Sequence, residues 1–299
     1  MKIGFIGLGR MGFPMVERLL KHNIKVVAFN RSSEKVTKIV RKGALPSSSV
    51  EDLVNKLPEK KIVWLMLPAG KATDLMIKKV LPLLNKGDII VDGANDFYKN
   101  AERHDRWCKK VGVRFFDCGV SGGVWGLKKG YTLMVGGPKT HFKRIEPLCK
   151  ALSAKGGYGY FGDVGAGHFV KSVHNIIEYV YLQGIAEGIE LLHNFKQPID
   201  MVKATSVWRP ASVVNSWLMD LTNTALKRSD FKTIGSKIGS VTIEELQNTK
   251  KAVKGYAPAF DVAVKIRKDK SRKFILGKRT IAAVRNEFGG HKVVKVRKK

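Results

Sequence analysis

The first half of the chain alternates short apolar runs with segments that have helical spacing. Residues 2–6 form a β-branched and aromatic run, and the segment that follows carries Met15, Leu19 and Leu20 at the spacing of one helix face. The alternation then repeats, which predicts a doubly wound α/β sheet with helices between its strands. Further strands are predicted at residues 25–30, 61–67, 88–95, 113–123, 131–137 and 158–162.

The pattern changes after Gly165, where helical periods dominate and an all-α region is expected. Its first element is a long helix from about residue 167 to residue 193. Apolar residues cover most of the circumference of this helix, so we expect it to be buried. The sequence therefore predicts two domains, an α/β domain at residues 1–164 and a helical domain at residues 165–299.

Four polar residues share one side of this long helix. Lys171, His174, Asn175 and Glu178 stand at relative positions 0, 3, 4 and 7, which place them on one stripe. Burying charged groups without partners costs several kcal/mol each. The stripe therefore indicates either an internal ion pair between Lys171 and Glu178 or a polar cavity that the four side chains line.

Size and composition set the class of protein. A chain of 299 residues with 44% hydrophobic residues fits two domains with real cores. The absence of a leader pattern and of any run of about 20 apolar residues predicts a cytoplasmic protein with no membrane segment. Cys108, Cys118 and Cys149 are odd in number and lack CxxC spacing, so we expect reduced, structural cysteines and no metal site.

The chain is strongly basic, with a formal charge of +30. Eight basic residues stand between Lys265 and Arg279 against the single acid Asp269, and the closing segment HKVVKVRKK contains no acid. Such a charge attracts phosphorylated metabolites, nucleotides or nucleic acid. No aromatic stacking platform is interleaved with the basic residues, so we interpret them as a solvated surface and expect no specific nucleic-acid partner.

A glycine-rich turn joins the first predicted strand to the first helix. Gly7 allows the tight turn, Gly9 lets a pyrophosphate approach the backbone, and Gly12 permits close packing of the helix. In this strand-turn-helix context the motif predicts a Rossmann-type dinucleotide-binding domain. The turn residues expected to contact the cofactor are Gly7, Leu8, Gly9, Met11 and Gly12.

The end of the second strand indicates which dinucleotide is bound. An NAD-selective site usually has an acidic residue about 20 positions after the glycines, and this chain has Asn30, Arg31 and Ser32 there. A guanidinium with short polar neighbours suits a 2′-phosphate, so we expect NADP as the cofactor and NAD as the alternative. The competing interpretation is that Arg31 is an ordinary surface arginine.

The loops that follow three later strands are expected to lie close to the glycine turn. Ligands of doubly wound sheets bind beyond the carboxyl ends of the strands, which places segments 67–70, 92–96 and 119–126 around one crevice. Glycines in these loops can expose N–H groups to anions, although each loop alone is also an ordinary turn. The cofactor contacts expected from these loops are Leu67, Pro68, Ala69 and Asn95.

Several motifs together resemble one family. These are GLGRMG, DGAN, GVSGG, GAGHFVKSVHNIIEY, VWRPASVVNSWLMDL and RNEFGGH. The chain resembles the 6-phosphogluconate dehydrogenases, a branch of the β-hydroxyacid dehydrogenase superfamily, and its length resembles their short form. The superfamily shares Lys171 and Asn175, whereas His174, Glu178 and Tyr179 resemble the phosphogluconate branch.

The chain also departs from that family. Ile176 stands where the family usually has Gly, Asp96 where it commonly has Ser, and Pro210 where it often has Arg or Gly. The short form often carries an acidic residue near position 30 and prefers NAD. The Asn30-Arg31-Ser32 sequence instead resembles the NADP-using long form.

The reaction that the resemblance implies explains the polar stripe. Oxidation of 6-phosphogluconate and loss of carbon dioxide give ribulose 5-phosphate in the pentose phosphate pathway. A buried lysine near other cations has a lowered pKa, so Lys171 can take the hydroxyl proton and later return it to the carbonyl oxygen during decarboxylation. Glu178 would protonate the first carbon of the enediol. The resemblance implies these same two roles.

Substrate binding is expected from both halves of the chain. The residues expected to bind the sugar acid are His174, Asn175, Asn95, Ser121, Gly122 and Gly123. Arg285 and His291, with Tyr179, are expected at the phosphate, because the family uses a matching Arg and His from a neighbouring subunit. The alternative is an ordinary basic tail. A homodimer or higher homo-oligomer is expected, since dimers are the commonest closed assembly.

Two other functions remain open from the sequence. One is another β-hydroxyacid dehydrogenase that acts on an unphosphorylated acid such as 3-hydroxyisobutyrate, which requires no selective role for Glu178 or Arg285. The other is a non-catalytic nucleic-acid-binding protein that uses the same scaffold and its basic charge.

Overall fold

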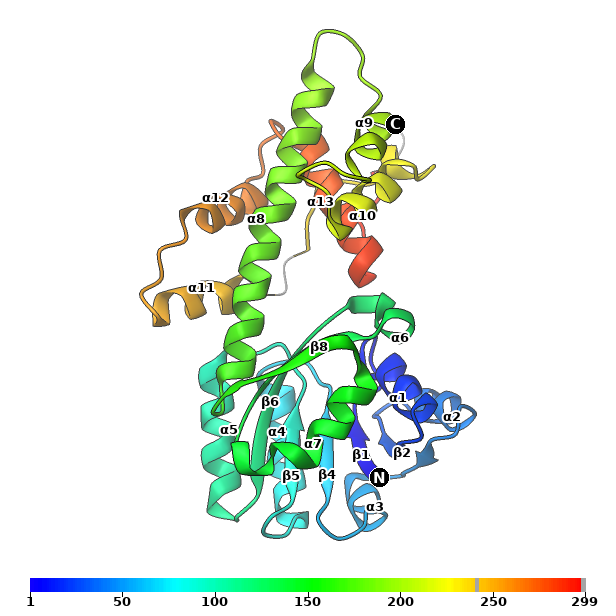
Figure 1. Cartoon of the computed structure of the whole chain (residues 1–299), viewed down its shortest axis with the longest axis vertical. Coiled ribbons are helices and arrows are strands. Elements are labelled where there is room, and N and C mark those ends of the chain that lie inside the picture. Colours follow the sequence, from blue (N-terminus) through cyan, green and yellow to red (C-terminus); the bar gives the residue numbers. More distant parts are fainter. Residues whose placement is uncertain (240–241, 297–299) are drawn as a thin grey trace. The chain divides into compact units, whose positions relative to one another are not determined.

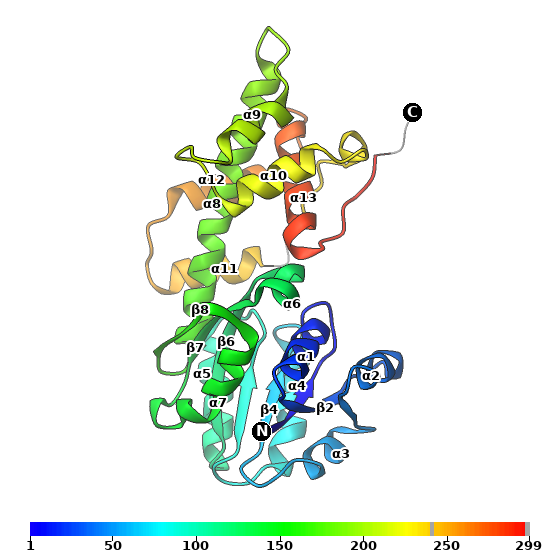
Figure 2. The ribbon, with the colours of Figure 1, turned by 45° about the vertical axis from the view of Figure 1, so that its right-hand side comes forward.

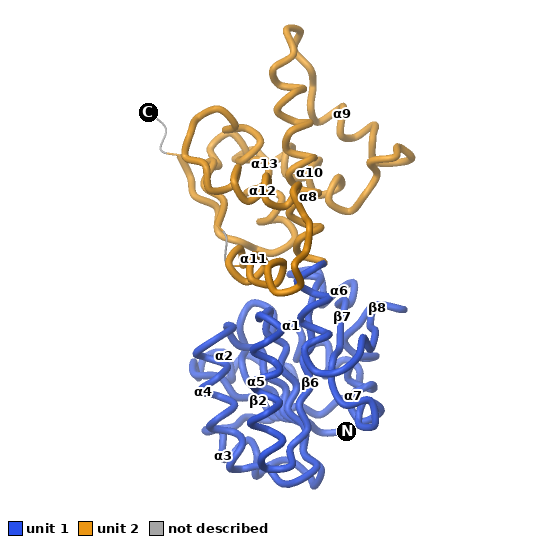
Figure 3. Tube along the Cα trace, turned by 90° about the vertical axis from the view of Figure 1, so that its left-hand side faces the viewer, with its two compact units in different colours: residues 1–173 blue, residues 174–299 orange. Residues whose placement is uncertain are grey.

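A computed structural model describes residues 1–239 and 242–296 (Figure 1), so the last three residues of the basic tail lie outside the described residues. The chain forms two compact units, Met1–Val173 and His174–Lys299 (Figure 3). The units divide within the long helix α8 (Ala166–Asn194), later than the predicted boundary at residue 164. The difference arises because the first turns of α8 pack directly on strands of the first unit. The substrate-binding and dimerisation roles of residues 165–299 stay a prediction.

The first unit contains an eight-stranded sheet with the order β3-β2-β1-β4-β5-β6-β7-β8. Strands β1 to β6 run parallel, β7 is antiparallel to β6, and β8 is parallel to β7. The bounds are β1 (Lys2–Ile6), β2 (Lys25–Phe29), β3 (Leu45–Pro46), β4 (Ile62–Leu65), β5 (Ile89–Asp92), β6 (Arg114–Ser121), β7 (Tyr131–Gly136) and β8 (Ser153–Gly162).

Alternating side chains of the central strands fill two cores, one on each face of the sheet. Trp64 of β4 faces the core that contains Met15 of α1, whereas Val63 and Leu65 face the core that contains Ile77 of α4. Central parallel strands are buried on both faces, so every residue of β4 and β5 is buried. The predicted doubly wound fold is confirmed. The helices of this unit are α1 (Gly12–Lys21), α2 (Ser33–Val40), α3 (Val50–Asn55), α4 (Lys71–Val80), α5 (Tyr98–Lys110), α6 (Gly126–Lys129) and α7 (Lys139–Leu152).

The reversal of direction at β7 was not predicted. The connection from β6 to β7 contains only a 3-10 turn (Gly123–Trp125) and α6. A parallel crossover needs a dozen or more residues, so a connection this short favours an antiparallel neighbour. Hydrophobic alternation located the strand but carries no information about its direction.

The second unit is helical, as predicted, apart from an isolated bridge between Ile234 and Lys295. Leu182, Ile185 and Ile189 of α8 share its main core with residues of α10 and α13. Helix α10 packs against both α9 and α13 (Figure 2). The remaining bounds are α9 (Met201–Trp208), α10 (Trp217–Leu226), α11 (Ile243–Ala252), α12 (Pro258–Lys268) and α13 (Ile275–Gly289).

The prediction that α8 is buried is wrong for one side of the helix. The exposed fraction is 38% for Val173, 60% for Ile177 and 73% for Leu191. With Tyr181, these residues fall within roughly 80° around the helix axis, opposite Lys171 and Asn175. No described element packs over that side, so an apolar pattern all round the helix did not mean burial all round it.

Two further expectations concern membranes and cysteines. No helix among the described residues is long and apolar enough to cross a membrane. Cys108, Cys118 and Cys149 are free and buried, as expected. Burial raises the pKa of the Cys108 and Cys149 thiols to about 12, so these groups are uncharged near neutral pH.

Candidate active site

The glycine turn between β1 and α1 is built by close backbone contacts. Gly7 has φ of 104°, a conformation that favours glycine, and a Cβ on Gly12 would overlap the carbonyl oxygen of Gly7. A Cβ on Gly9 would meet no atom within 4 Å, so the backbone there is open to a ligand. Leu8 is fully buried, and its N–H donates to Asn30 Oδ1 over 2.9 Å. Asn30 therefore ties the end of β2 to the turn.

A cavity of about 640 Å³ lies at the end of β2. Arg31 lines it together with Lys79 and Thr37, which the sequence reasoning missed because they stand in separate helices. The side-chain amide of Asn30 donates to the carbonyl oxygen of Ser32 over 3.3 Å, which shapes the loop that carries Arg31. Lys79 also lies 3.6 Å from Glu51 Oε1, whereas Arg31 is a cation of the kind that suits an anionic group such as a 2′-phosphate.

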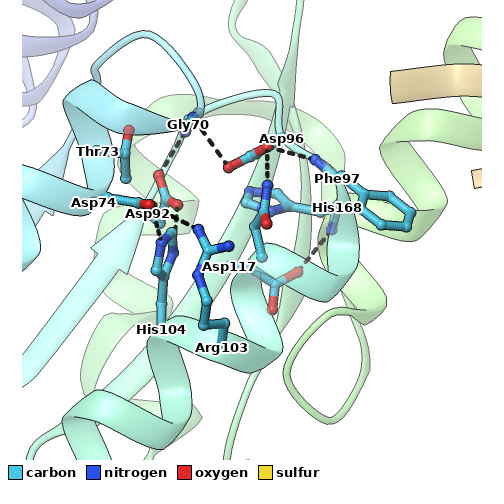
Figure 4. A network of polar contacts seen from close by, with 12 residues as sticks. Gly70, Thr73, Asp74, Asp92, Asp96, Phe97, Arg103, His104, Asp117 and His168 are labelled. Atoms are coloured by element: carbon cyan, nitrogen blue, oxygen red, sulfur yellow. Dashed lines mark hydrogen bonds and ion pairs between the residues drawn. The ribbon is translucent and has the colours of Figure 1, made fainter. Parts of the chain in front are cut away.

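Asp96 joins the loops that follow β4 and β5 (Figure 4). Its Oδ1 accepts the N–H of Phe97 at 2.7 Å and the side-chain amide of Asn100 at 2.8 Å, and its Oδ2 accepts the N–H of Gly70 at 3.4 Å. The departure from the family's serine thus supplies partners in both loops. Asn95, next to Asp96, is exposed. Leu67, Pro68 and Ala69 lie in the first of the two loops.

A polar network, buried at His104 and Asp92 and partly exposed at Asp74 and Arg103, lies beside these loops and joins α4 to α5 (Figure 4). Asp74 accepts from Arg103 at 2.8 Å and contacts His104 Nε2 at 2.7 Å, and His104 Nδ1 lies 3.8 Å from Asp92 Oδ2. Burial raises the pKa of the Asp92 carboxyl. The network links α4 to α5, whose N-terminal ends follow the loops after β4 and β5.

Lys171 lies at the carboxyl end of β6, within the first unit. Its side chain is 5% exposed, and a Cβ on Gly119 would stand 2.9 Å from its Cγ atom. Two residues further along β6, Ser121 begins the predicted binding loop, in which Gly122 and Gly123 have φ of 120° and 53°. The structure therefore brings the predicted base next to the strand that carries this loop.

The rest of the stripe continues along α8, as predicted. Asn175 is 7% exposed, and its Oδ1 lies 3.1 Å from His174 Nδ1. His174 and Glu178 are half-buried, because they lie closer to the exposed side of the helix than Lys171 does. The contact between His174 Nδ1 and Asn175 Oδ1 fixes the two side chains relative to each other on one face of the helix.

Tyr179 lies beside a buried cation that the sequence reasoning missed. The Arg267 guanidinium carbon lies 3.4 Å from the centre of the Tyr179 ring, and Arg267 is only 8% exposed. Among the described residues, none of its three nitrogens has a hydrogen-bond partner, and neither has the Tyr179 hydroxyl. Burial, with a smaller contribution from Arg285, lowers the pKa of Arg267 to about 10, although Tyr179 and Glu178 act in the opposite direction. A desolvated cation next to a second cation is an incomplete anion site.

Arg285 and His291 stand on either side of the end of α13. Arg285 is 6% exposed, and its Nη1 donates to the carbonyl oxygen of Gly239. Gly290 ends the helix with φ of 57°, and Asn286 Nδ2 donates to the carbonyl oxygen of His291 over 2.8 Å. The structure thus places Arg285 near Arg267 and turns the chain back at His291, which explains the two glycines before this histidine.

Among residues 1–239 and 242–296, no group of three or more His, Cys, Asp or Glu side chains could hold a metal ion.

Comparisons with known proteins identify the family. The profile of the NAD binding domain of 6-phosphogluconate dehydrogenase matches residues 2–162, and the profile of the C-terminal domain of the same enzyme matches residues 167–255. The chain belongs to the 6-phosphogluconate dehydrogenase family. The resemblance, the nicotinamide-dinucleotide domain and the expected class of oxidoreductase are thereby confirmed.

Relatives in the 6-phosphogluconate dehydrogenase family cover this chain to different extents. The NAD(+)-dependent, decarboxylating 6-phosphogluconate dehydrogenase of Haloferax volcanii is 39% identical over 81% of this chain and 78% of its own length. The protein YqeC of Bacillus subtilis is 35% identical over 97% of this chain and 98% of its own. The 6-phosphogluconate dehydrogenase of Plasmodium falciparum, studied with its cofactor NADP+ and its substrate 6-phosphogluconate, has a TM-score of 0.81 and 28% identity, over 89% of this chain and 61% of its own.

Proposed function

We propose that this protein oxidises 6-phosphogluconate with transfer of hydride to NADP and releases carbon dioxide and ribulose 5-phosphate, as a step of the pentose phosphate pathway. The buried Arg267 guanidinium carries this proposal. It stacks on Tyr179 close to Arg285 without a hydrogen-bond partner among the described residues. A substrate phosphate supplies the missing acceptors, whereas an unphosphorylated hydroxy acid leaves the cation unsatisfied.

Lys171 and Glu178 divide the proton transfers. NADP held at the glycine turn would supply the oxidant, which takes a hydride from the carbon that lies β to the carboxylate. Lys171 takes the hydroxyl proton of that carbon, which leaves a β-keto acid. When the bond to the carboxylate breaks, the electron pair moves to the keto group, and Lys171 returns its proton to the carbonyl oxygen. Glu178 then protonates the first carbon of the enediol.

NADP is the proposed cofactor because of the cavity at the end of β2. Arg31 and Lys79 line this cavity together with neutral polar residues such as Thr37, and Lys79 also pairs with Glu51 at 3.6 Å. A carboxylate at position 30 would repel a 2′-phosphate, but this chain has Asn30, whose Oδ1 already accepts the Leu8 N–H. NAD is the alternative cofactor, since nothing at this position excludes a ribose hydroxyl.

A homodimer is the proposed assembly. The exposed side of α8 carries Ile177 and Leu191, which are 60% and 73% exposed. Large exposed apolar side chains along one helix side typically mark a protein interface. Light scattering should give the mass of a dimer, and Ile177→Glu should shift it toward the monomer. A monomeric wild-type protein at working concentration would contradict the assembly.

A spectrophotometric assay tests the function. Reduction of NADP and of NAD is followed separately with 6-phosphogluconate, gluconate and 3-hydroxyisobutyrate. We expect fast reduction of NADP with 6-phosphogluconate only. Preferred turnover of 3-hydroxyisobutyrate would replace the proposal with the unphosphorylated-acid alternative, and no turnover of any of the three acids would refute it.

A further inference from the structure

Asp117 is a fully buried carboxylate that the proposed chemistry does not use. It stands on β6, where its Oδ1 accepts the N–H of Gly165 and its Oδ2 accepts the N–H of His168, each over 2.7 Å (Figure 4). These donors lie 48 and 51 residues away in the sequence. Because α8 begins at Ala166, Asp117 satisfies N–H groups at a helix start that have no partner within the helix.

Glycines bring the start of α8 directly onto the backbone of the sheet. A Cβ on Gly136 would lie 2.7 Å from both Asp117 Oδ1 and the nitrogen of Gly167. A Cβ on Gly167 would lie 2.6 Å from the carbonyl oxygen of Asp117. No flexible side chain separates helix and sheet here, so a displacement of the carboxylate or of the first turn is transmitted to the other.

Lys171 follows one turn after this contact. Its stem packs against Gly119, two residues after Asp117 on the same strand. Ser172 Oγ donates to the carbonyl oxygen of His168 over 2.9 Å, which links the clamped turn to the next one. The height and rotation of Lys171 above β6 therefore depend on where Asp117 holds residues 165 and 168.

We propose that Asp117 is a positioning residue for Lys171. Its carboxylate clamps the first turn of α8 and thereby sets the place of the lysine amine, an inference that rests on the proposed role of Lys171 as the base. Proton and hydride transfer depend steeply on geometry, and a displacement of about 1 Å costs on the order of 10²-fold in rate. A shift of the helix start should therefore lower kcat more than it changes ligand binding.

Asp117→Asn tests the clamp. The amide keeps the size of the side chain, but its NH₂ group faces one of the two N–H donors and cannot accept from it. We expect kcat to fall by at least about 10-fold, with about 2-fold or smaller changes in the KM for 6-phosphogluconate and in the Kd for NADP.

Asp88→Asn is the matched control. Asp88 is 2% exposed, and its two oxygens accept the N–H groups of Lys61 and Asn85 at 2.7 and 2.8 Å, just before β5 and far in sequence from α8. The Asp88→Asn variant loses the same kind of buried hydrogen bond as Asp117→Asn, but Asp88 does not contact the helix that carries Lys171. We expect a similar fall in Tm for both variants and an unchanged kcat for Asp88→Asn.

Amide hydrogen exchange gives a readout that does not depend on activity. In the wild-type protein the N–H groups of Gly165 and His168 should exchange as slowly as those of the central strands. Exchange of both amides should become faster in Asp117→Asn and should stay unchanged in Asp88→Asn. Fast exchange of these two amides in the wild type would overturn the clamp even if the variant failed to fold.

The kinetic outcomes separate this inference from the proposed function. An inactive Lys171→Met with a kcat within about 2-fold of wild type in Asp117→Asn would overturn the positioning role alone. An equal loss of kcat in Asp88→Asn would also overturn it, because general destabilisation would then explain both losses. An active Lys171→Met would refute Lys171 as the base and with it the positioning role, while hydrogen exchange would still decide whether the clamp exists.

Discussion

Two regions of the molecule each contain one buried charged side chain. Asp117 lies at the start of α8 in the first unit, and Arg267 lies beside Tyr179 in the second unit. The two side chains differ in their hydrogen-bond partners. Both oxygens of Asp117 accept backbone hydrogen bonds. None of the three nitrogens of Arg267 has a partner among the described residues. Burial alone therefore does not separate a structural charge from a binding charge. The number of partners does, because a buried charge without partners is expensive to keep.

The same difference predicts how each region responds to ligand. Asp117 has its partners whether or not substrate is bound, so it contributes to the stability of the free protein. The nitrogens of Arg267 would gain hydrogen-bond partners when an anion enters, so an anion that binds there should stabilise the protein. The predictions that follow test this contrast.

The largest effect is expected for Lys171→Met, which removes the amine that the first region positions. Turnover should fall by about 10²- to 10⁴-fold while the Kd for NADP stays unchanged, and Glu178→Gln should also lose turnover on this scale. Steady-state kinetics and cofactor titration measure both quantities. The control is Lys278→Met, which alters another buried lysine, one that donates to the carbonyl oxygen of Asp269 over 2.6 Å. Lys278→Met should lower Tm and leave turnover unchanged. Near-normal turnover in Lys171→Met would contradict the proposed mechanism.

Arg267→Met tests whether Arg267 is a binding charge, in contrast to the structural charge of Asp117. Loss of a charge-assisted hydrogen bond of about 1.5–3 kcal/mol should raise the KM for 6-phosphogluconate by roughly 10- to 100-fold. Any residual oxidation of gluconate should be unaffected, since gluconate has no phosphate. Because the nitrogens of Arg267 have no hydrogen-bond partner among the described residues, Tm should fall less than in Asp117→Asn, which loses a buried hydrogen bond. A Tm loss as large as that of Asp117→Asn would show that Arg267 is a structural charge after all.

Arg31→Ala applies the same reasoning to the cofactor. Its guanidinium can engage a 2′-phosphate, so the variant should weaken NADP by about 1.5–3 kcal/mol and leave NAD nearly unchanged. Fluorescence titration with each dinucleotide measures the difference. Arg41→Ala, an exposed arginine just after α2, is the control and should change neither affinity. Equal losses for NADP and NAD in Arg31→Ala would exclude it as the selector.

The smallest effect is expected for Arg285→Ala, because Arg285 also donates to the carbonyl oxygen of Gly239 and Arg267 remains in place. We expect a rise of about 10-fold or less in the KM for 6-phosphogluconate and a smaller change in kcat. Lys292→Ala removes one exposed charge from the same end of the chain and should leave both constants unchanged. Comparable damage to gluconate oxidation in Arg285→Ala would assign Arg285 to the fold.

The sequence predicted the parts of the molecule that depend on local periodicity. Most strands, the glycine turn and the extent of α8 follow from apolar spacing and from Gly7, Gly9 and Gly12, but β3 was not predicted and β8 begins at Ser153, before the predicted residue 158. The direction of β7 did not follow, since alternation is the same in both directions. The exposed side of α8 did not follow either, because apolar residues such as Ile177 are equally compatible with a core and with a protein interface.

The sequence alone does not single out Arg267, because it stands within the basic run of residues 265–279. Phe260, Val264 and Arg267 are all buried and stand four and then three positions apart, which is the spacing of one helix face. That spacing was a signal that Arg267 points inward with the apolar residues. Asp117 left a weaker signal, an acid inside the apolar run FFDCG, and its donors could be identified only from the tertiary structure.

The release of carbon dioxide tests the proposed reaction most directly. The substrate is 6-phosphogluconate labelled with ¹³C in its carboxylate, and NADPH and ¹³CO₂ are measured in the same reaction. Equimolar NADPH and ¹³CO₂, both abolished in Lys171→Met, are the predicted result. NADPH formed without ¹³CO₂ would show a dehydrogenase that does not decarboxylate, and would contradict the roles proposed for Lys171 and Glu178.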